Sequence, residues 1–194
     1  MRLKRKNVLK VGLTDGSNAL KKIILGLAVV TMLAGCNDGI DAFGIKLDSN
    51  SDQLKKDGLV KRENLIPSKQ HFLEAQLNKA PEPALGDAAV YSVNSVNGKV
   101  IGVRGSLDDT QSAFYKGAVE YAKSKLGDPI ATEEGITDAS EVDKIPYGCV
   151  KQGSCPTPKY AVFRKSDVSA MVSSGDGATT LMFDTDEIKE ALRQ

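Results

Sequence analysis

An apolar stretch without charged residues, Ile23–Ala34, is the feature that most limits how this chain can fold. It follows a segment, residues 1–22, that carries seven basic side chains and one acidic side chain. The stretch is too short to cross a bilayer, because a membrane-spanning helix needs about 20 apolar residues. A basic segment followed by a short apolar segment and small residues is typical of a secretory signal. We therefore expect the folded part of the chain to begin after it.

The apolar stretch ends in Leu33-Ala34-Gly35-Cys36. This sequence resembles the lipobox, L-[AS]-[GA]-C, of bacterial lipoproteins processed by the lipoprotein signal peptidase, and the resemblance covers residues 21–36 only. It implies that residues 1–35 are a cleaved signal peptide. It also implies that Cys36 is thioether-linked to diacylglycerol and acylated, typically with palmitate, so that the lipid bilayer holds the chain firmly. There are two alternatives to a cleaved lipoprotein signal. The apolar stretch could be a buried helix that happens to end in Cys, or it could be an uncleaved anchor.

The residue after the lipobox cysteine is Asn37, not Asp. In lipoproteins of the enterobacterial type, an Asp at this position favours retention in the inner membrane. The resemblance therefore implies an outer-membrane location facing the periplasm, with the inner membrane and the cell surface as alternatives. Residues 36–194 carry 19 basic and 24 acidic side chains, once residues 1–22 are excluded from the totals of 26 and 25. This acidic balance argues against nucleic-acid binding, which needs basic surface.

Two cysteines remain after Cys36, namely Cys149 and Cys155. An even number of cysteines in an oxidising compartment indicates a disulfide. A redox or metal-binding pair is the alternative, but redox pairs are usually C-x-x-C and no further ligands lie nearby in the sequence. The single histidine, His71, excludes His-rich zinc sites, and a surface or half-buried imidazole is the expectation for it. We expect no metal and no cofactor.

The pattern along residues 36–194 predicts a flexible tether followed by one domain. The polar run Asp48–Asp52 indicates that residues 36–59 form the tether, which leaves residues 60–194 as a periplasmic α+β domain. The expected helices are Ser68–Lys79, a helix capped by Asp108 that ends at Gly127, and Asp186–Arg193 capped by Thr185. The expected strands are a hairpin in Val90–Arg104 and a three-strand meander, Lys159–Arg164, Val168–Ser173 and Thr179–Phe183. The segment Ile130–Pro158 before the meander shows little periodicity, and we expect a loop with a solvated acidic first half and a second half ordered by the cysteine pair. The predicted fold is therefore a small antiparallel sheet with helices packed on one face.

The hairpin has Asn97-Gly98 at its turn. A three-residue loop that pairs Ser95 with Lys99 places four apolar residues on one face, so we expect this register. These four residues are Tyr91, Val93, Ile101 and Val103. The apolar stripe expected on the following helix consists of Phe114, Ala118, Tyr121, Ala122 and Leu126.

The chain contains no nucleophile elbow, phosphate-binding loop or metal-ligand cluster, and it has one His and no Trp. We therefore expect no catalytic residues and a non-catalytic binding or accessory module, whose partner is another envelope protein or a cell-wall component. Its expected signature is an exposed apolar patch on the meander or the cysteine loop. One alternative is a cell-wall-acting enzyme that uses carboxylates with perturbed pKa values, for example Glu133, Glu134 and Asp143. The other is a structural or surface-exposed lipoprotein.

Overall fold

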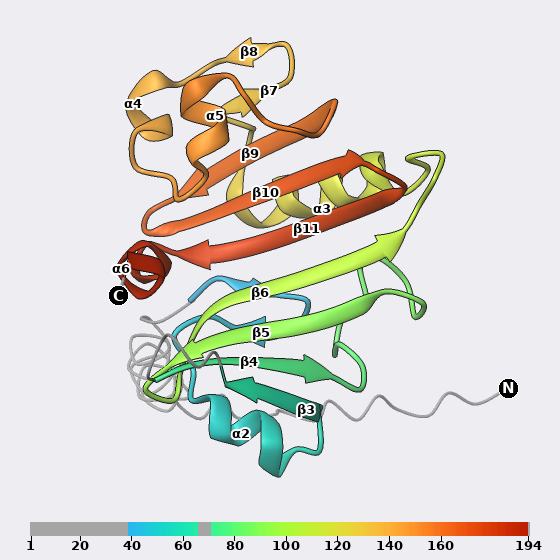
Figure 1. Cartoon of the computed structure of the whole chain (residues 1–194), viewed down its shortest axis with the longest axis vertical. Helices are drawn as coiled ribbons and strands as arrows, with labels where there is room; N and C mark the ends of the chain where they lie inside the picture. The colour runs from blue at the N-terminus through green and yellow to red at the C-terminus, as the bar shows by residue number, and fades with distance from the viewer. Residues whose placement is uncertain (1–38, 66–70, 194) are drawn as a thin grey trace, which may run out of the picture. The chain divides into compact units, whose positions relative to one another are not determined.

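Antiparallel β-strands make up more of the structure than helices do (Figure 1). The computed structural model describes residues 39–65 and 71–193. The strands of the main sheet are β3 (Val60–Leu65), β4 (Phe72–Leu77), β5 (Val90–Val96), β6 (Lys99–Asp108), β7 (Ala131–Thr132), β8 (Gly135–Ile136), β9 (Lys159–Lys165), β10 (Val168–Gly175) and β11 (Ala178–Thr185). A separate hairpin consists of β1 (Asp41–Ala42) and β2 (Ile45–Lys46). The helices are α2 (Ser51–Lys56), α3 (Tyr115–Leu126), α4 (Ala139–Val142), α5 (Gly148–Gln152) and α6 (Glu187–Arg193).

The main sheet has nine strands in the order β3-β4-β5-β6-β11-β10-β9-β7-β8, and every neighbouring pair is antiparallel. The predicted fold class, a small sheet with helices on one face, is therefore wrong. The five predicted strands are all present, as β5, β6, β9, β10 and β11. Four of the missed strands, β1, β2, β7 and β8, are only two residues long. Strand β3 lacks alternating apolar residues, and β4 consists mostly of good helix formers.

One face of the sheet holds the largest hydrophobic cluster. Helix α3 covers the β9–β11 half of this face, which lies behind the sheet in Figure 1, through Ala118, Ala122 and Leu126. The β1–β2 hairpin and the segment before β5 belong to the same cluster, with Phe43 and Leu85 both nearly inaccessible to solvent. Four aromatic rings meet in this layer, and the Phe43 ring stacks on Tyr121 with 5.5 Å between the ring centroids.

The predicted tether extends too far along the chain, because the folded unit begins at Gly39 and not near residue 60. Phe43, Ile45 and Leu47 are at most 2% exposed, and Leu54 of α2 is also buried. The apolar residues in this segment are too few and too irregularly spaced to show a helical or strand period. Their burial depends on strands that follow much later in the chain.

Strand β4 occupies the segment that we predicted as the helix Ser68–Lys79, whose first three residues, 68–70, lie outside the described part of the chain. Leu, Glu, Ala and Gln favour helices in isolation, but tertiary context overrides such preferences. Here Leu77 belongs to the core cluster and Ala75 is buried opposite Val93 of β5, whereas Glu74 and Gln76 point to the other face. This alternation satisfies a strand and not a helix.

The β5–β6 hairpin is confirmed, but its predicted register is wrong. Val96 pairs with Lys99, so the loop has two residues, and Asn97 and Gly98 both have positive φ, as this turn type requires. A bulge beside Ser95 then shifts the pairing by one residue. Because of this bulge, Ile101 packs with α6 on the opposite face from Val103.

Two predicted helix starts are also wrong. Asp108 is the last residue of β6, and the neighbouring Asp109 instead accepts hydrogen bonds from the backbone N–H groups of Ala113 and Phe114. Helix α3 begins only at Tyr115, and the predicted core residue Phe114 is 47% exposed. At the start of α6, the Thr185 hydroxyl is buried and makes no capping hydrogen bond.

The second face of the sheet, which faces the viewer in Figure 1, is covered only in part by described elements. Val142, Ile145 and Val150, from the segment predicted as a loop, pack on Val162 and Met171 of β9 and β10. At one end of the sheet α6 packs on β4 and β6 through the cluster Phe72, Ile101, Ile188 and Ala191. Beyond the α6 contact, no described element covers this face over β3, β4, β5 and the central part of β6. We call this area, together with the adjoining Met182 and Asp184 of β11, the open face.

Candidate binding face

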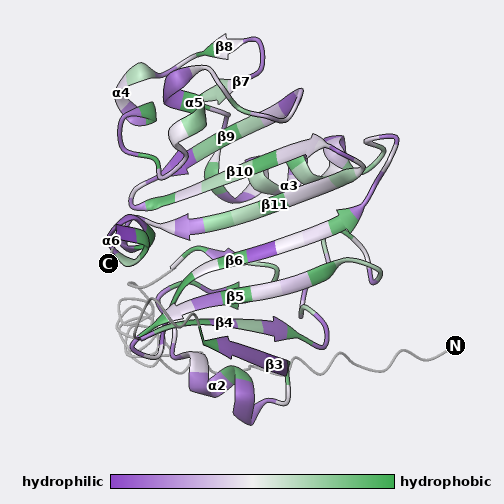
Figure 2. Cartoon of the chain, viewed as in Figure 1, coloured by the Kyte–Doolittle hydropathy of each residue, from purple (hydrophilic) through white to green (hydrophobic). Residues whose placement is uncertain are grey.

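Two rows of directly opposed residues cross the open face, and both are polar over β3, β4 and β5. One row consists of Arg62, Gln76, Ser92, Arg104 and Met182. The other consists of Asn64, Glu74, Asn94, Gly102 and Asp184. Figure 2 shows the contrast with the meander, since β3 is hydrophilic over most of its length whereas β10 and β11 are mostly apolar or neutral. Each row collects one residue from each of five strands.

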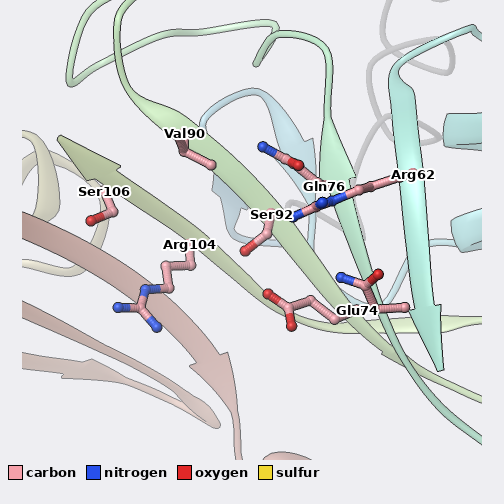
Figure 3. A pocket seen from close by; sticks show the side chains of 8 residues that line it. Arg62, Glu74, Gln76, Val90, Ser92, Arg104 and Ser106 are labelled. Atoms are coloured by element: carbon pink, nitrogen blue, oxygen red, sulfur yellow. The ribbon is translucent and has the colours of Figure 1, made fainter. Parts of the chain in front are cut away.

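A polar hollow of about 200 Å³ lies on the open face (Figure 3). Its lining residues come from β3, β4, β5 and β6 and are Arg62, Asn64, Glu74, Gln76, Val90, Ser92, Arg104 and Ser106. Two guanidinium groups and one carboxylate line it, together with hydroxyl and amide groups that both donate and accept hydrogen bonds. The hollow therefore suits a polar ligand that carries a negative charge.

An apolar pocket, also of about 200 Å³, lies on the same face. Its lining combines the end of the sheet with α6 and the segment before α5, and consists of Phe72, Asn94, Arg104, Pro146, Tyr147, Met182, Asp184, Ile188 and Leu192. Most of these side chains are apolar, and a few polar groups converge among them. This combination is typical of small ligand sites.

Arg104 lines both the polar hollow and the apolar pocket. Its side chain is exposed, and within the part of the chain that the structure describes it forms no ion pair or side-chain hydrogen bond. Ser92 lies directly opposite on β5 and Met182 directly opposite on β11. Arg104 therefore presents an exposed guanidinium at the boundary between a polar and an apolar surface, and the carboxylate of Asp184 is the charged group that acts on it electrostatically.

Asp184 forms the floor of the apolar pocket and is 7% exposed. Its carboxylate accepts a hydrogen bond of 3.0 Å from the Tyr147 hydroxyl, which also lies 3.3 Å from the Ser169 carbonyl oxygen. Burial raises the pKa of Asp184 to about 6, and the Tyr147 hydrogen bond and the Arg104 charge offset this effect only in part. Burial and the neighbouring Asp184 carboxylate also raise the pKa of Tyr147.

Gly102 is required opposite Asp184. A Cβ atom at this position would lie 2.6 Å from Oδ1 of Asp184, closer than non-bonded atoms can approach. The absence of a side chain on β6 therefore leaves the space that the Asp184 carboxylate occupies. This is the only glycine in the two rows.

A buried arginine secures the wall of the apolar pocket. The Arg164 side chain is 4% exposed and donates two hydrogen bonds to Asp186, of 2.8 and 2.7 Å. It also donates to Glu141 at the end of α4 and to Ser169 of β10. This network joins β9, β10, α4 and the start of α6, so that the covering elements hold a defined position beside the pocket.

The residues that the sequence singled out lie elsewhere. Cys36 and the predicted signal peptide are outside the described residues. The sulfur atoms of Cys149 and Cys155 lie 2.11 Å apart as a disulfide, which closes α5 over the β9–β10 side of the sheet. His71 is exposed, with a φ of +78°, in the turn before β4.

The carboxylates that we considered for an enzyme are not brought together. Glu133 and Glu134 line a hollow beside α3, whereas Asp143 lines a different hollow next to α6. The exposed large apolar side chains of the described residues also do not form the expected patch on the meander. They come from five separate segments and are Leu65, Val90, Phe114, Ile136 and Leu192.

The residues of the open face could not be identified from the sequence, because the sequence does not show which strands pair. The alternation of polar residues in Val90–Arg104 is the one local signal, because Ser92, Asn94 and Arg104 alternate with the apolar residues and so share one face. The contributions of β3, β4 and β11 depend on pairings between distant segments. Arg62 and Asp184, for example, belong to the same face although they lie near opposite ends of the folded unit.

Comparison of the chain with protein-family models, with curated proteins and with solved structures finds no match. Among the described residues, no group of three or more His, Cys, Asp or Glu side chains is placed to hold a metal ion. None of the described helices combines the length and the apolar character that crossing a membrane requires. The assignment of a function therefore depends on the geometry of the site and on the sequence.

Proposed function

We propose that this chain is a bacterial envelope lipoprotein, anchored through acylated Cys36 on the periplasmic side of the outer membrane. Its folded unit is a non-catalytic binding or accessory module that holds another envelope protein or a cell-wall component on the open face. The single observation that carries the binding role is the position of Arg104, which lines both the polar hollow and the apolar pocket. The anchoring role is supported by the lipobox sequence Leu33–Cys36.

A polar sheet face is by itself weak support, because antiparallel sheets commonly leave one face in water. The open face differs from a plain solvated face in two respects. It carries a largely apolar pocket of about 200 Å³, and an exposed arginine lines that pocket. A binding surface accounts for both features, whereas a purely structural lipoprotein accounts for neither.

The enzyme alternative has one observation in its favour, the raised pKa of Asp184. A general acid has to reach the proton acceptor of its substrate within hydrogen-bond distance. Asp184 is 7% exposed, and its carboxylate is engaged by the Tyr147 hydroxyl from the covering segment. We therefore assign Asp184 to holding Tyr147 in the pocket wall, and not to catalysis.

The binding role is tested by photo-crosslinking in intact cells. A photoreactive benzoylphenylalanine replaces Val90, which is 53% exposed and lines the polar hollow. The matched control places the same group at Lys116, an exposed position on α3. We expect a discrete crosslinked species from position 90 that disappears in the Arg104→Glu background, and none from position 116. Equal products from both positions, or none from either, would favour the structural or surface-exposed alternative.

The lipid anchor is tested separately with Cys36→Ser. This substitution removes the thiol that would receive diacylglycerol, so we expect a slower-migrating precursor that does not incorporate labelled palmitate. Electrophoretic mobility and palmitate labelling measure the two effects. Normal processing of the variant would contradict the lipoprotein assignment without bearing on the binding face.

A further inference from the structure

We propose that the open face binds the carboxyl-terminal end of a partner polypeptide whose last residue has an apolar side chain. The last side chain enters the apolar pocket, the terminal carboxylate pairs with Arg104, and the preceding residues lie over the polar hollow. This inference rests on the proposed function and specifies its ligand.

The charge of the site selects the carboxylate. A guanidinium offers forked N–H donors that match the two oxygens of a carboxylate, and Arg104 has no ion pair within the described ranges. The Ser92 hydroxyl, directly opposite on β5, is a further donor. Glu74 lines the same hollow and Asp184 lines the apolar pocket together with Arg104. A ligand with several negative charges is therefore disfavoured, and one with a single carboxylate fits.

The volume of the apolar pocket selects a single side chain. A cavity of about 150 Å³ is large enough for benzene, and drug-sized ligands need roughly 300–1,000 Å³. At about 200 Å³ the pocket therefore accepts one side chain of the size of Leu or Phe, and it is too small for a lipid acyl chain. Phe72, Met182 and Ile188 supply apolar contacts for such a side chain.

The polar hollow favours a polypeptide over a free carboxylic acid. It extends from Arg104 across β5 and β4 to β3, away from the apolar pocket. Hydroxyl and amide side chains along it, such as Ser92, Gln76 and Asn64, can donate to and accept from the backbone groups of an extended peptide. A free acid with one apolar group would leave this half of the face unused.

Fluorescence anisotropy with the full-length chain in detergent tests the inference. The probe is a fluorescein-labelled hexapeptide of Gly and Ser that ends in Leu, as the free acid or as the carboxyl-terminal amide. A second free-acid peptide ends in Ser, and N-acetyl-leucine serves as a small competitor. We expect the Leu free acid to bind at least tenfold more tightly than its amide and than the Ser peptide, and N-acetyl-leucine to compete only weakly.

Arg104→Gln should abolish the difference between acid and amide while preserving the preference for Leu over Ser. Lys116→Gln, which removes the same charge from α3, should change neither. Equal affinities of the acid and the amide, an unchanged profile in Arg104→Gln, or no binding of any probe would each overturn the inference. Competition by N-acetyl-leucine at the affinity of the peptide would overturn the polypeptide as the source of the carboxylate. If the crosslink from position 90 persists in these cases, the proposed function stands and only its ligand is wrong; if the crosslink is also absent, both fail.

Discussion

Gly102 and Asp184 face each other across β6 and β11, and their contact decides how the floor of the apolar pocket is built. The carboxylate fills the volume that a side chain on β6 would otherwise take, and Tyr147 donates to it from the opposite side. A buried carboxyl with a single hydrogen-bond donor is held at a cost in free energy, because burial penalises its charged form. The two residues therefore have separate and measurable consequences for stability.

We predict that Gly102→Ala lowers the free energy of unfolding by about 1–3 kcal/mol, because the added Cβ displaces a buried carboxylate in a packed layer. Gly117→Ala is the matched control, since no atom lies within 4 Å of its added Cβ on α3. The control should stabilise the protein by about 0.5–1 kcal/mol through helix propensity. Urea denaturation of both variants measures the difference, and equal effects would mean that the 2.6 Å approach is not a constraint.

Asp184→Asn should remove a pH dependence of stability. The folded state binds the Asp184 proton more tightly than the unfolded chain does, since the pKa is about 6 in the fold and about 3.9 in model peptides. The free energy of unfolding of the wild type should therefore fall by about 2–3 kcal/mol between pH 4 and pH 7 relative to the variant. Asn keeps an acceptor for Tyr147 but has no charge to bury. Chemical denaturation of both proteins across this range measures the effect, and parallel pH profiles would show that Asp184 is not buried as described.

At the scale of elements, the positions of α4 and α5 on the second face depend more on Arg164 and its contacts than on the stability of the two helices themselves. Helix α4 has four residues and α5 has five, lengths at which isolated helices do not persist in water. The Arg164 network and the Cys149–Cys155 disulfide join these short elements to the sheet. The wall of the apolar pocket is thus positioned by long-range contacts.

We expect Arg164→Gln to lower the free energy of unfolding by about 2 kcal/mol, because hydrogen bonds to charged groups contribute about 1.5–3 kcal/mol each and the two carboxylates can partly rehydrate. Arg193→Gln is the control, since the Arg193–Glu190 pair is exposed and such pairs contribute about 0–1 kcal/mol. Denaturation of the two variants gives the comparison. A similar small loss in both would mean that Arg164 does not hold the pocket wall.

At the scale of the whole molecule, the β1–β2 hairpin completes the core of a sheet whose other strands come later in the chain. Phe43, Ile45 and Leu47 are at most 2% exposed. Burying three such side chains contributes about 5–9 kcal/mol, which is comparable with the whole stability of a typical domain, about 5–15 kcal/mol. The N-terminal part of the folded unit is therefore structural, although it was predicted to be a tether.

A chain that begins at residue 60, where the sequence placed the domain boundary, should fail to fold cooperatively. A chain that begins at Gly39, the start of the folded unit, should fold with a single transition. Circular dichroism and thermal melting distinguish the two. Cooperative folding of the shorter chain would show that the hairpin is dispensable for the core.

The signals that could be read from the sequence are those set by neighbours in the chain. Asn97-Gly98 takes positive φ values that few other pairs tolerate, so the β5–β6 turn could be located, and Gly127 likewise marked the end of α3. The short polar turns of the meander determined β9, β10 and β11 in the same way. The lipobox at Cys36 is also local, and it remains a prediction.

Only the tertiary structure determined which strands pair with one another and in which register. Strand β4 consists of helix formers and becomes a strand because β3 and β5 pair with it on both sides. The bulge beside Ser95 changes which face Ile101 occupies, and the open face gathers Arg62, Arg104 and Asp184 from distant segments. The physical reason is that strand pairing gains its free energy from partners far along the chain, so turn chemistry and local periodicity contain no record of the register that assembles the binding face.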